Sequence, residues 1–410
     1  MNWGEEAQAR LSQIAACSTT ADGVSRLPFS PEHEAALLHI RDWMQRAGLD
    51  PEMTVSGTLV GRSATGQGPT LILGSHQDSV PHGGRYDGIM GILLPCLALE
   101  KMRAEGRQPA VAIEVVAFAD EEGVRFPTAL IGPRALAGTL DLAVLDLTDA
   151  EGVSIADAMR NFGCAPDQLS GLHRRAEDVL GFVEVHIEQG PVLERAGRAL
   201  GSVTGICGIE RNAVVFTGET GHAGTMPMQG RKDALVAAST FISGVHALAA
   251  ETDDVRATVG TLRLVPGAVN AIPKRVELVL ELRAINNARR HSLHEAAAAL
   301  ARQSAAAMGC TVHFEKTYQQ DAVLCDDRLQ ALVSDAIQSV QGEGDVLALP
   351  SGATHDASAM ADLCPVAMMF VRCRGGVSHR PDESVTDSDL NAAVQSLDRF
   401  LNSISEEAVS

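Results

Sequence analysis

The sequence predicts an α/β protein in which an α+β domain is inserted into a domain built on a mostly parallel mixed sheet. Towards both ends of the chain, apolar runs of strand length alternate with helical patterns, which is typical of such sheets. The middle of the chain combines strands of alternating character with long helices. The length of 410 residues suits two or three domains. We therefore expect a main domain at 1–207 and 323–410, and an inserted domain at 208–322.

The elements of the main domain follow from short sequence signals. Ser30 and Pro31 open a helical pattern that stops at Gly48, and these residue types are common at such positions. A second helix is expected from 89 to 103. Four apolar runs have the length of buried strands, namely 71–73, 111–118, 182–185 and 366–371.

The inserted domain has a different pattern. Its expected strands alternate in character, and its expected helices are longer than those of the main domain. The strands are expected at 211–218, 258–264 and 275–283, and the helices at 232–250 and 288–308. The second helix is rich in alanine, so we expect one of its faces to pack on the sheet.

Composition argues against several classes of function. The formal net charge of -19 repels phosphate backbones and anionic membranes, so we expect no nucleic-acid partner. No apolar run approaches the ~20 residues that span a bilayer, and the acidic start of the chain does not resemble a signal peptide. The eight cysteines form no CxxC pair and suit a reducing compartment. We therefore expect a cytoplasmic protein.

Four polar clusters follow the four apolar strands. They lie at 74–78, 120–123, 186–190 and 378–381. Sites in open α/β sheets form at the carboxyl ends of the strands. If these strands are parallel neighbours, the clusters converge on one crevice, and Asp87 can join them from the loop after the first cluster.

The residue types in these clusters indicate a divalent metal site. Histidines and carboxylates without cysteine suit zinc, manganese, cobalt or nickel. His76 and Asp78 share one face of an extended segment, so Asp78 can brace His76 through its ring or through the local backbone. Glu121 and Glu122 are adjacent and must diverge, which allows one to bind metal and the other to face a water molecule. Each feature alone is usually structural or solvated, but their joint placement is hard to explain by chance.

Six segments carry a resemblance to a known family. They are GSHQDSVPHGGRYDG, FADEEGVRF, VEVHIEQGPVLE, GHAGTMPMQGRKDA, PGAVNAIP and VSHRPDE. In these segments and their order, the sequence resembles the carbamoylase/allantoate amidohydrolase branch of the M20 metallopeptidase superfamily, from about residue 30 to 390. This branch includes N-carbamoyl-L-amino acid hydrolases, β-ureidopropionases and allantoate amidohydrolases.

The resemblance implies a site for two divalent metal ions. His76, Asp87 and His186 would bind the first ion. Asp87, Glu122 and His379 would bind the second, with Asp87 bridging the two. Catalysis is expected from Glu121, Asp78 and His222, with Glu121 as the general base.

The resemblance also implies that the inserted block is a lid and dimerisation domain in a homodimer. Within it, His222 would stabilise an oxyanion, while Asn270 and Arg283 would hold a substrate carboxylate. Gln189, from the main domain, would contact the ureido group. An exposed ion pair is the alternative for Arg283. We expect Arg231 and Asp233 to form a structural pair.

The expected reaction is hydrolysis of the ureido group of a small carboxylate, with release of ammonia and carbon dioxide. Allantoate is the first candidate, because RFPTALIGPRALAGTLD resembles allantoate hydrolases more than carbamoyl-amino-acid hydrolases. An N-carbamoyl-L-amino acid or N-carbamoyl-β-alanine is the alternative. A dipeptidase or aminoacylase, and a metal-binding protein without activity, are more distant ones. Pro133 and Thr354 depart from the pattern of the family and bear on the shape of the pocket.

Overall fold

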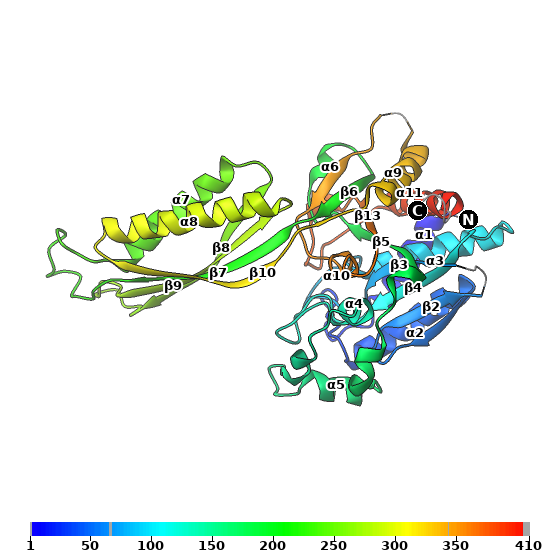
Figure 1. Cartoon of the computed structure of the whole chain (residues 1–410), viewed down its shortest axis with the longest axis horizontal. Coiled ribbons are helices and arrows are strands. Elements are labelled where there is room, and N and C mark those ends of the chain that lie inside the picture. The colour runs from blue at the N-terminus through cyan, green and yellow to red at the C-terminus, as the bar shows by residue number, and fades with distance from the viewer. Residues whose placement is uncertain (1, 65–67, 343, 405–410) are drawn as a thin grey trace. The chain divides into compact units, whose positions relative to one another are not determined.

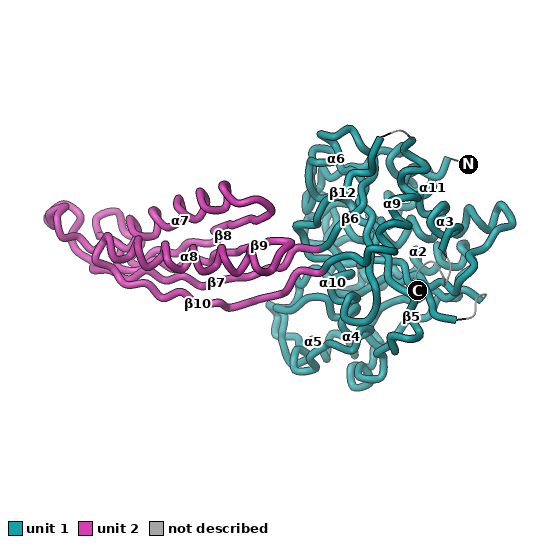
Figure 2. The backbone as a smooth tube through the Cα atoms, turned by 45° about the horizontal axis from the view of Figure 1, so that its top comes forward, with its two compact units in different colours: residues 1–205, 324–410 teal, residues 206–323 magenta. Residues whose placement is uncertain are grey.

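The computed structural model describes residues 2–64, 68–342 and 344–404, and the chain divides into two compact units (Figure 2). Unit 1 comprises residues 1–205 and 324–410, and unit 2 comprises residues 206–323. Each unit has a sheet and a hydrophobic core of its own. Among the described residues, no helix has the length and apolar character needed to cross a membrane.

Unit 1 is built on a mixed sheet of nine strands. Their order is β1-β2-β4-β3-β5-β13-β6-β11, and β12 pairs with β6. The strands are β1 (Leu49–Met53), β2 (Leu59–Ser63), β3 (Thr70–His76), β4 (Ala112–Phe118), β5 (Val179–Ile187), β6 (Leu200–Ile206), β11 (Val323–Leu324), β12 (Ala348–Ser351) and β13 (Val366–Val371).

The four strands predicted from apolar runs are neighbours in the centre of this sheet. Strands β4, β3, β5 and β13 run parallel to one another, with His76 opposite Phe118 and Phe370 opposite His186. Antiparallel pairs flank them, because β2 pairs with β4 and β6 pairs with β13. The predicted fold class is therefore confirmed, and the carboxyl ends of all four strands lie at one edge.

The helices of unit 1 are α1 (Trp3–Ile14), α2 (Pro31–Arg46), α3 (Ile89–Ala104), α4 (Ile131–Ala137), α5 (Ile155–Asn161), α6 (Val192–Arg195), α9 (Asp327–Gln341), α10 (Asp356–Met360) and α11 (Asp387–Ser403), with short 3-10 turns at η1 (Leu142–Asp146), η2 (Pro166–Gly171), η3 (Ala176–Asp178) and η4 (Arg374–Gly376). Helices α1, α2, α3, α9 and α11 share one core with the central strands (Figure 1). Helix α2 begins as predicted, because the Ser30 side chain accepts a hydrogen bond from the His33 backbone N–H at 3.2 Å.

Unit 2 is an antiparallel sheet of four strands in the order β10-β7-β9-β8. The strands are β7 (Gly208–Thr217), β8 (Val255–Val265), β9 (Arg275–Ala284) and β10 (Thr311–Gln320). Helices α7 (Ala234–Ala250) and α8 (Asn287–Ala307) bury the apolar residues of the sheet. The alternating burial along β9 agrees with the predicted strand of alternating character.

Some elements were not predicted. Strand β1 contains Pro51, which lacks a backbone N–H and is tolerated at the edge of a sheet, where β1 lies. Strand β10 is an edge strand with mostly exposed side chains, so it lacks an apolar run. Helices α9 and α11 are amphipathic and pack on each other, and neither was among the elements expected from the sequence.

Candidate metal centre

The candidate site lies at the carboxyl ends of the four central strands of unit 1. His76 is the last residue of β3, and His186 is the second-last residue of β5. Glu121 and Glu122 follow β4, and His379 lies beyond β13. Parallel strands with adjacent carboxyl ends therefore place these side chains in one region.

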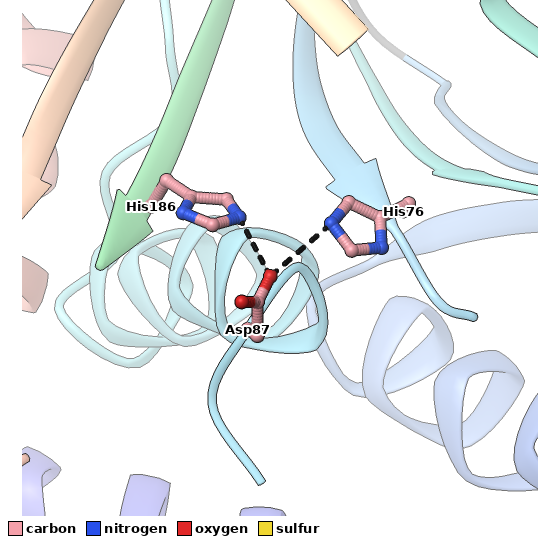
Figure 3. A group of neighbouring side chains, drawn as sticks. All are labelled: His76, Asp87 and His186. Carbon is pink, nitrogen blue, oxygen red and sulfur yellow. Dashed lines mark ion pairs between the residues drawn. The ribbon is translucent and has the colours of Figure 1, made fainter. Parts of the chain in front are cut away.

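The first group of side chains is centred on Asp87. Its Oδ1 lies 3.1 Å from His186 Nε2 and 3.5 Å from His76 Nε2 (Figure 3). All three residues are buried. The Nδ1–H of His76 donates to the backbone oxygen of Asp78, and that of His186 donates to the backbone oxygen of Ile187, each at 3.0 Å. With Nδ1 as the donor, the Nε2 atom of each ring is left as the one that can ligate a metal, and in this structure His186 Nε2 accepts from the Gly88 backbone N–H at 3.2 Å.

The second group uses the other oxygen of the same carboxylate. Asp87 Oδ2 lies 3.5 Å from His379 Nε2, and this nitrogen lies 3.9 Å from Glu122 Oε2. One ligand atom from each of Asp87, Glu122 and His379 falls within 4.8 Å of the others. The two groups therefore share Asp87, one through each of its oxygens.

Asp78 holds the segment that carries the two glutamates. Its Oδ1 accepts a hydrogen bond from the Glu121 backbone N–H at 3.1 Å, and its Oδ2 accepts one from the Glu122 backbone N–H at 3.2 Å. Asp78 thus braces His76 through its backbone oxygen and positions the glutamates through its carboxylate. Glu122 is directed at His379, while Glu121 is buried close enough to His76 for their charges to interact.

The site concentrates negative charge where water is scarce. Burial raises the pKa of Glu121 well above its usual range, with His76 opposing the shift and Glu122 reinforcing it. Burial and repulsion from Asp87 raise the pKa of Glu122 to about 8. Burial would also raise the pKa of Asp87, but His186 and His76 hold it well below its usual range. Ionised carboxylates in such a place need nearby positive charge.

The residues fit divalent cations as ligands. They offer imidazole nitrogens and carboxylate oxygens, a donor set that zinc, manganese, cobalt and nickel accept. Glu122 Oε1 is buried and has no hydrogen-bond partner within the described part of the chain. A buried carboxylate oxygen of this kind is satisfied when it ligates a metal.

Three residues that support Asp87 and the central strands were not singled out from the sequence. The Ser378 hydroxyl donates to Asp87 Oδ2 at 2.7 Å. Glu383 Oε1 accepts from the backbone N–H groups of Tyr86 and Asp87, at 2.9 and 3.1 Å. Glu184 accepts from the Ser75 hydroxyl at 2.7 Å. Ser378 and Glu383 belong to the segment VSHRPDE, so their proximity to His379 was the available signal.

Two buried residues at the start of α10 were also not predicted. His355 packs edge-on against His186, with ring centroids 4.6 Å apart, and its Nε2 lies 2.7 Å from the Ser351 hydroxyl. With Glu184 and His186, His355 forms a further group of potential ligand atoms. Burial holds the pKa of His355 well below its usual range, which keeps the ring neutral. Asp356 is also fully buried, and burial raises its pKa well above the usual range.

The expected substrate contacts are divided between the units. In unit 1, Gln189 Nε2 donates to Asp87 Oδ2 at 2.8 Å and to the Ser378 hydroxyl at 3.2 Å, so Gln189 adjoins both groups. In unit 2, the loops of His222 and Asn270 are joined, because the Ala223 N–H donates to the Asn270 backbone oxygen at 2.9 Å. His222, Asn270 and Arg283 all lie in unit 2, whereas both groups of ligands lie in unit 1.

Arg283 lies on β9 and is half-buried. Its Nε donates to Glu281 Oε1 at 2.8 Å, which is the ion pair considered as the alternative for this residue. The expected pair of Arg231 and Asp233 was wrong. Asp233 caps α7 by accepting from the Leu235 and Val236 backbone N–H groups, whereas Arg231 donates to backbone oxygens.

Comparisons with known proteins identify relatives along most of the chain. The sequence profile described as Peptidase family M20/M25/M40 matches residues 72–403. An allantoate deiminase from Arabidopsis thaliana is 36% identical over 430 residues, covering 97% of this chain and 82% of the relative. An N-carbamoyl-L-amino acid amidohydrolase from Geobacillus stearothermophilus is 38% identical over 397 residues, covering 96% and 97%. The crystal structure of an amidase of the hydantoinase/carbamoylase family from Burkholderia multivorans superposes with a TM-score of 0.90 at 29% identity, covering 98% and 97%.

Proposed function

The chain belongs to peptidase family M20/M25/M40, and on this premise we propose that it hydrolyses the ureido group of allantoate. Its relatives make it an amidohydrolase of the allantoate deiminase and N-carbamoyl-L-amino acid amidohydrolase branch, which acts on carbon–nitrogen bonds. The observation that carries the proposal is the pair of ligand groups that share Asp87, with the buried Glu121 beside them.

We assign two divalent ions to these groups. His76, Asp87 and His186 would hold one ion, and Asp87, Glu122 and His379 would hold the other. When bound, such ions polarise a carbonyl group and lower the pKa of water. The proposal leaves the identity of the metal among zinc, manganese, cobalt and nickel, because histidine and carboxylate ligands accept all of them.

Glu121 is the general base in this proposal. It takes a proton from a water molecule whose oxygen attacks the ureido carbonyl carbon, and it returns that proton to the leaving nitrogen as the carbon–nitrogen bond breaks. Decomposition of the resulting carbamate completes the release of ammonia and carbon dioxide. The Asp78 carboxylate keeps Glu121 in place through the hydrogen bond to its backbone N–H.

The remaining contacts bind the substrate. His222 donates a hydrogen bond to the developing oxyanion, and Gln189 contacts the ureido group. Asn270 and Arg283 hold the substrate carboxylate, for which the planar guanidinium offers two parallel N–H donors. In this proposal Arg283 exchanges its hydrogen bond to Glu281 for the substrate.

Unit 2 acts as a lid in this proposal, and it also joins two chains into a homodimer. Closure of the lid would bring its side chains onto the substrate and exclude water. We also propose a cytoplasmic location, because all eight cysteines are free thiols, five of them buried.

An N-carbamoyl-L-amino acid is the second candidate substrate. It is supported by the 38% identity to the N-carbamoyl-L-amino acid amidohydrolase from Geobacillus stearothermophilus. N-carbamoyl-β-alanine shares the same ureido and carboxylate groups and is a third candidate. All three candidates require the same ligand groups and the same base, so they differ in how the pocket receives the rest of the substrate.

The test is ammonia release by manganese-loaded protein from allantoate, N-carbamoyl-L-alanine and N-carbamoyl-β-alanine. Glu121→Gln serves as the control, because the amide keeps the size of the side chain and cannot accept the proton. We expect allantoate to be the best substrate and the variant to lose at least about 100-fold in kcat, the lower range for an essential acid–base group. Preference for a carbamoyl amino acid would transfer the assignment to the second candidate. Failure on all three substrates with metal bound would refute ureido hydrolysis.

A further inference from the structure

The guanidinium group of Arg231 forms hydrogen bonds with the backbone of the loop that carries His222. Arg231 Nη2 donates to the backbone oxygens of Ala223 at 2.7 Å and Met226 at 2.5 Å. Its Nε donates to the backbone oxygens of Met226 and Pro227, each at 3.2 Å. We call residues 222–228 the His222 loop. One side chain therefore satisfies three carbonyl groups, those of Ala223, Met226 and Pro227, in a segment that has no regular structure.

Arg231 differs in this respect from most arginines of unit 2. The composition of the chain includes 52 acidic residues, and most arginines of unit 2 bond to carboxylates, as Arg211, Arg263 and Arg275 do. Arg231 has no carboxylate partner within the described residues. Only the forked guanidinium can donate to several oxygens at fixed angles, whereas a lysine ammonium is a single flexible point of charge. The contacts therefore suit a rigid clamp on the backbone.

The conformation of the clamped loop determines which nitrogen of His222 carries a proton. The Gly224 backbone N–H donates to His222 Nδ1 at 3.1 Å, so Nδ1 is an acceptor. In the neutral ring the proton then lies on Nε2, and His222 presents a hydrogen-bond donor at the outer end of its ring. His222 is exposed, so this donor is available to a bound molecule.

The rest of the loop is tied to the segment that carries Asn270. The Ile272 N–H donates to the Gly221 oxygen, and the Ala223 N–H donates to the Asn270 oxygen, each at 2.9 Å. Arg231 takes no part in these backbone bonds. Its Nη2 donates instead to the carbonyl oxygen of Ala223. The Arg231 contact and the backbone bond thus restrain the segment that follows His222 through both the carbonyl and the N–H of Ala223.

We propose that Arg231 is a positioning residue, which holds the His222 loop so that His222 donates through Nε2 to the oxyanion of the substrate. This inference rests on the proposed function, because it assumes that His222 meets the reacting carbonyl. Arg231 itself touches no substrate in this scheme. Its loss should therefore act through His222, lowering kcat more than it raises KM.

The experiment compares Arg231→Ala and Arg231→Lys with Arg263→Ala in the metal-loaded full chain. Arg263 is the matched control, because it lies in the same unit, its side chain is 75% exposed, and it forms an ion pair with Glu277 at 3.3 Å. Hydrogen–deuterium exchange of the 222–228 peptide is measured beside kcat and KM for the best ureido substrate. Millimolar free guanidinium is then added to the Arg231→Ala protein.

We expect Arg231→Ala to lose about 100-fold in kcat, as for a misplacement of roughly 1 Å. Exchange of the loop should be faster, with metal content and melting temperature unchanged. The kcat of Arg231→Lys should be close to that of Arg231→Ala. Free guanidinium should restore part of the kcat of Arg231→Ala. Arg263→Ala should have the kcat of the wild type. A kcat loss in Arg231→Ala that adds in full to that of His222→Ala in the double variant would overturn the inference.

The exchange measurement separates this inference from the proposed function. If the wild type hydrolyses no ureido compound, the proposed function fails, and the clamp is judged by loop exchange alone. Wild-type exchange in Arg231→Ala would refute the clamp even if the enzyme were active. Faster exchange with an unchanged kcat would refute the positioning role.

Discussion

Asp78 illustrates how one buried carboxylate positions several chemical groups. Its two oxygens accept the backbone N–H groups of Glu121 and Glu122, and its own backbone oxygen accepts the Nδ1–H of His76. The proposed base and one ligand of each metal group therefore depend on this residue. The sequence spacing of His76 and Asp78 predicted the contact to the histidine. It could not predict the contacts to the glutamates, because these join strands that are neighbours only in the folded sheet.

Asp78→Asn should impair catalysis while leaving every proposed metal ligand in place. An amide has one acceptor oxygen, so one of the two backbone N–H groups would face its NH₂ group instead. Leaving a buried donor unsatisfied costs about 1–3 kcal/mol, so a shift of the Glu121 segment is the expected response. We expect a fall of about 100-fold in kcat, as for a misplacement of roughly 1 Å.

Metal content by mass spectrometry and steady-state kinetics test this prediction together. Asp50→Asn is a suitable control, because Asp50 is an exposed aspartate on β1. A variant with unchanged kcat would show that the contacts of Asp78 do not position the base. Loss of metal along with activity would instead assign Asp78 to the integrity of the ligands.

Gln189 and Ser378 mark the limit of residue-level prediction. Gln189 was expected to meet the substrate, and the structure shows its Nε2 bonded to Asp87 and Ser378. A sequence motif identifies the residue type but does not show which neighbour occupies its donor. Ser378 stands directly before a proposed ligand, yet a serine in a polar segment is too common for its spacing to single it out.

At the scale of elements, the turn between Asp87 and α3 requires glycine. Gly88 has a φ of 65°, a region that side chains disfavour. A Cβ at this position would lie 2.3 Å from His76 Cε1 and 2.4 Å from His76 Nδ1. The close approach of this turn to the histidine ring therefore brings Asp87 within reach of His76.

Gly88→Ala should displace the His76 ring or the Asp87 loop and so weaken metal binding. We expect metal affinity to fall by at least about 10-fold, the lower range for disturbed support of a ligand. Isothermal titration of metal-depleted protein with manganese measures this loss. Gly152→Ala is the control, because Gly152 also has a positive φ, of 83°, and its added Cβ would meet no atom within 4 Å. Equal affinity in both variants would show that the closeness at Gly88 is not needed.

His33 makes the start of α2 sensitive to acid. Its Nδ1 accepts the Phe29 backbone N–H at 2.9 Å, and the residue is fully buried. Burial, with repulsion from Arg26, lowers the pKa of His33 to about 3. The unfolded chain, with an ordinary pKa of 6.5, binds more protons between these two values. The free energy of unfolding must therefore fall as the pH drops from 6.5 towards 3.

His33→Gln should reduce this sensitivity, because its side-chain oxygen can accept the same N–H and does not titrate. Relative to the variant, the wild type should lose about 2 kcal/mol of unfolding free energy between pH 8 and pH 5. Urea unfolding of both proteins at the two pH values measures the difference. A constant gap between wild type and variant would show that His33 is protonated in the folded protein.

Several elements show what determines whether a prediction from sequence succeeds. The central strands were predicted because burial on both faces makes them continuously apolar. The edge strand β10 was missed because its exposed residues resemble a polar loop. The sequence did not show whether the central strands are parallel neighbours, because pairing between strands that are distant in the chain leaves no local signal. The convergence of the polar clusters was therefore expected only on the condition that they are.

At the scale of the whole molecule, the proposed metal centre belongs to unit 1 alone. Its ligands come from segments that are far apart in the chain, from β3 to the region beyond β13. A metal ion that binds the folded unit and not the unfolded chain must therefore stabilise unit 1 as a whole. The two tryptophans of the chain, Trp3 and Trp43, both lie in this unit, so tryptophan fluorescence reports on its unfolding.

Removal of metal by a chelator should lower the melting midpoint recorded by tryptophan fluorescence. At a free metal concentration 100 times the dissociation constant, binding contributes about 2.7 kcal/mol. His379→Ala retains the first ligand group and lacks part of the second, so chelation should lower its midpoint by less than that of the wild type. Equal shifts of the melting midpoint in both proteins would place the stabilising metal in the first group alone. An unchanged midpoint of the wild type would contradict a metal centre that holds the ends of the central strands together.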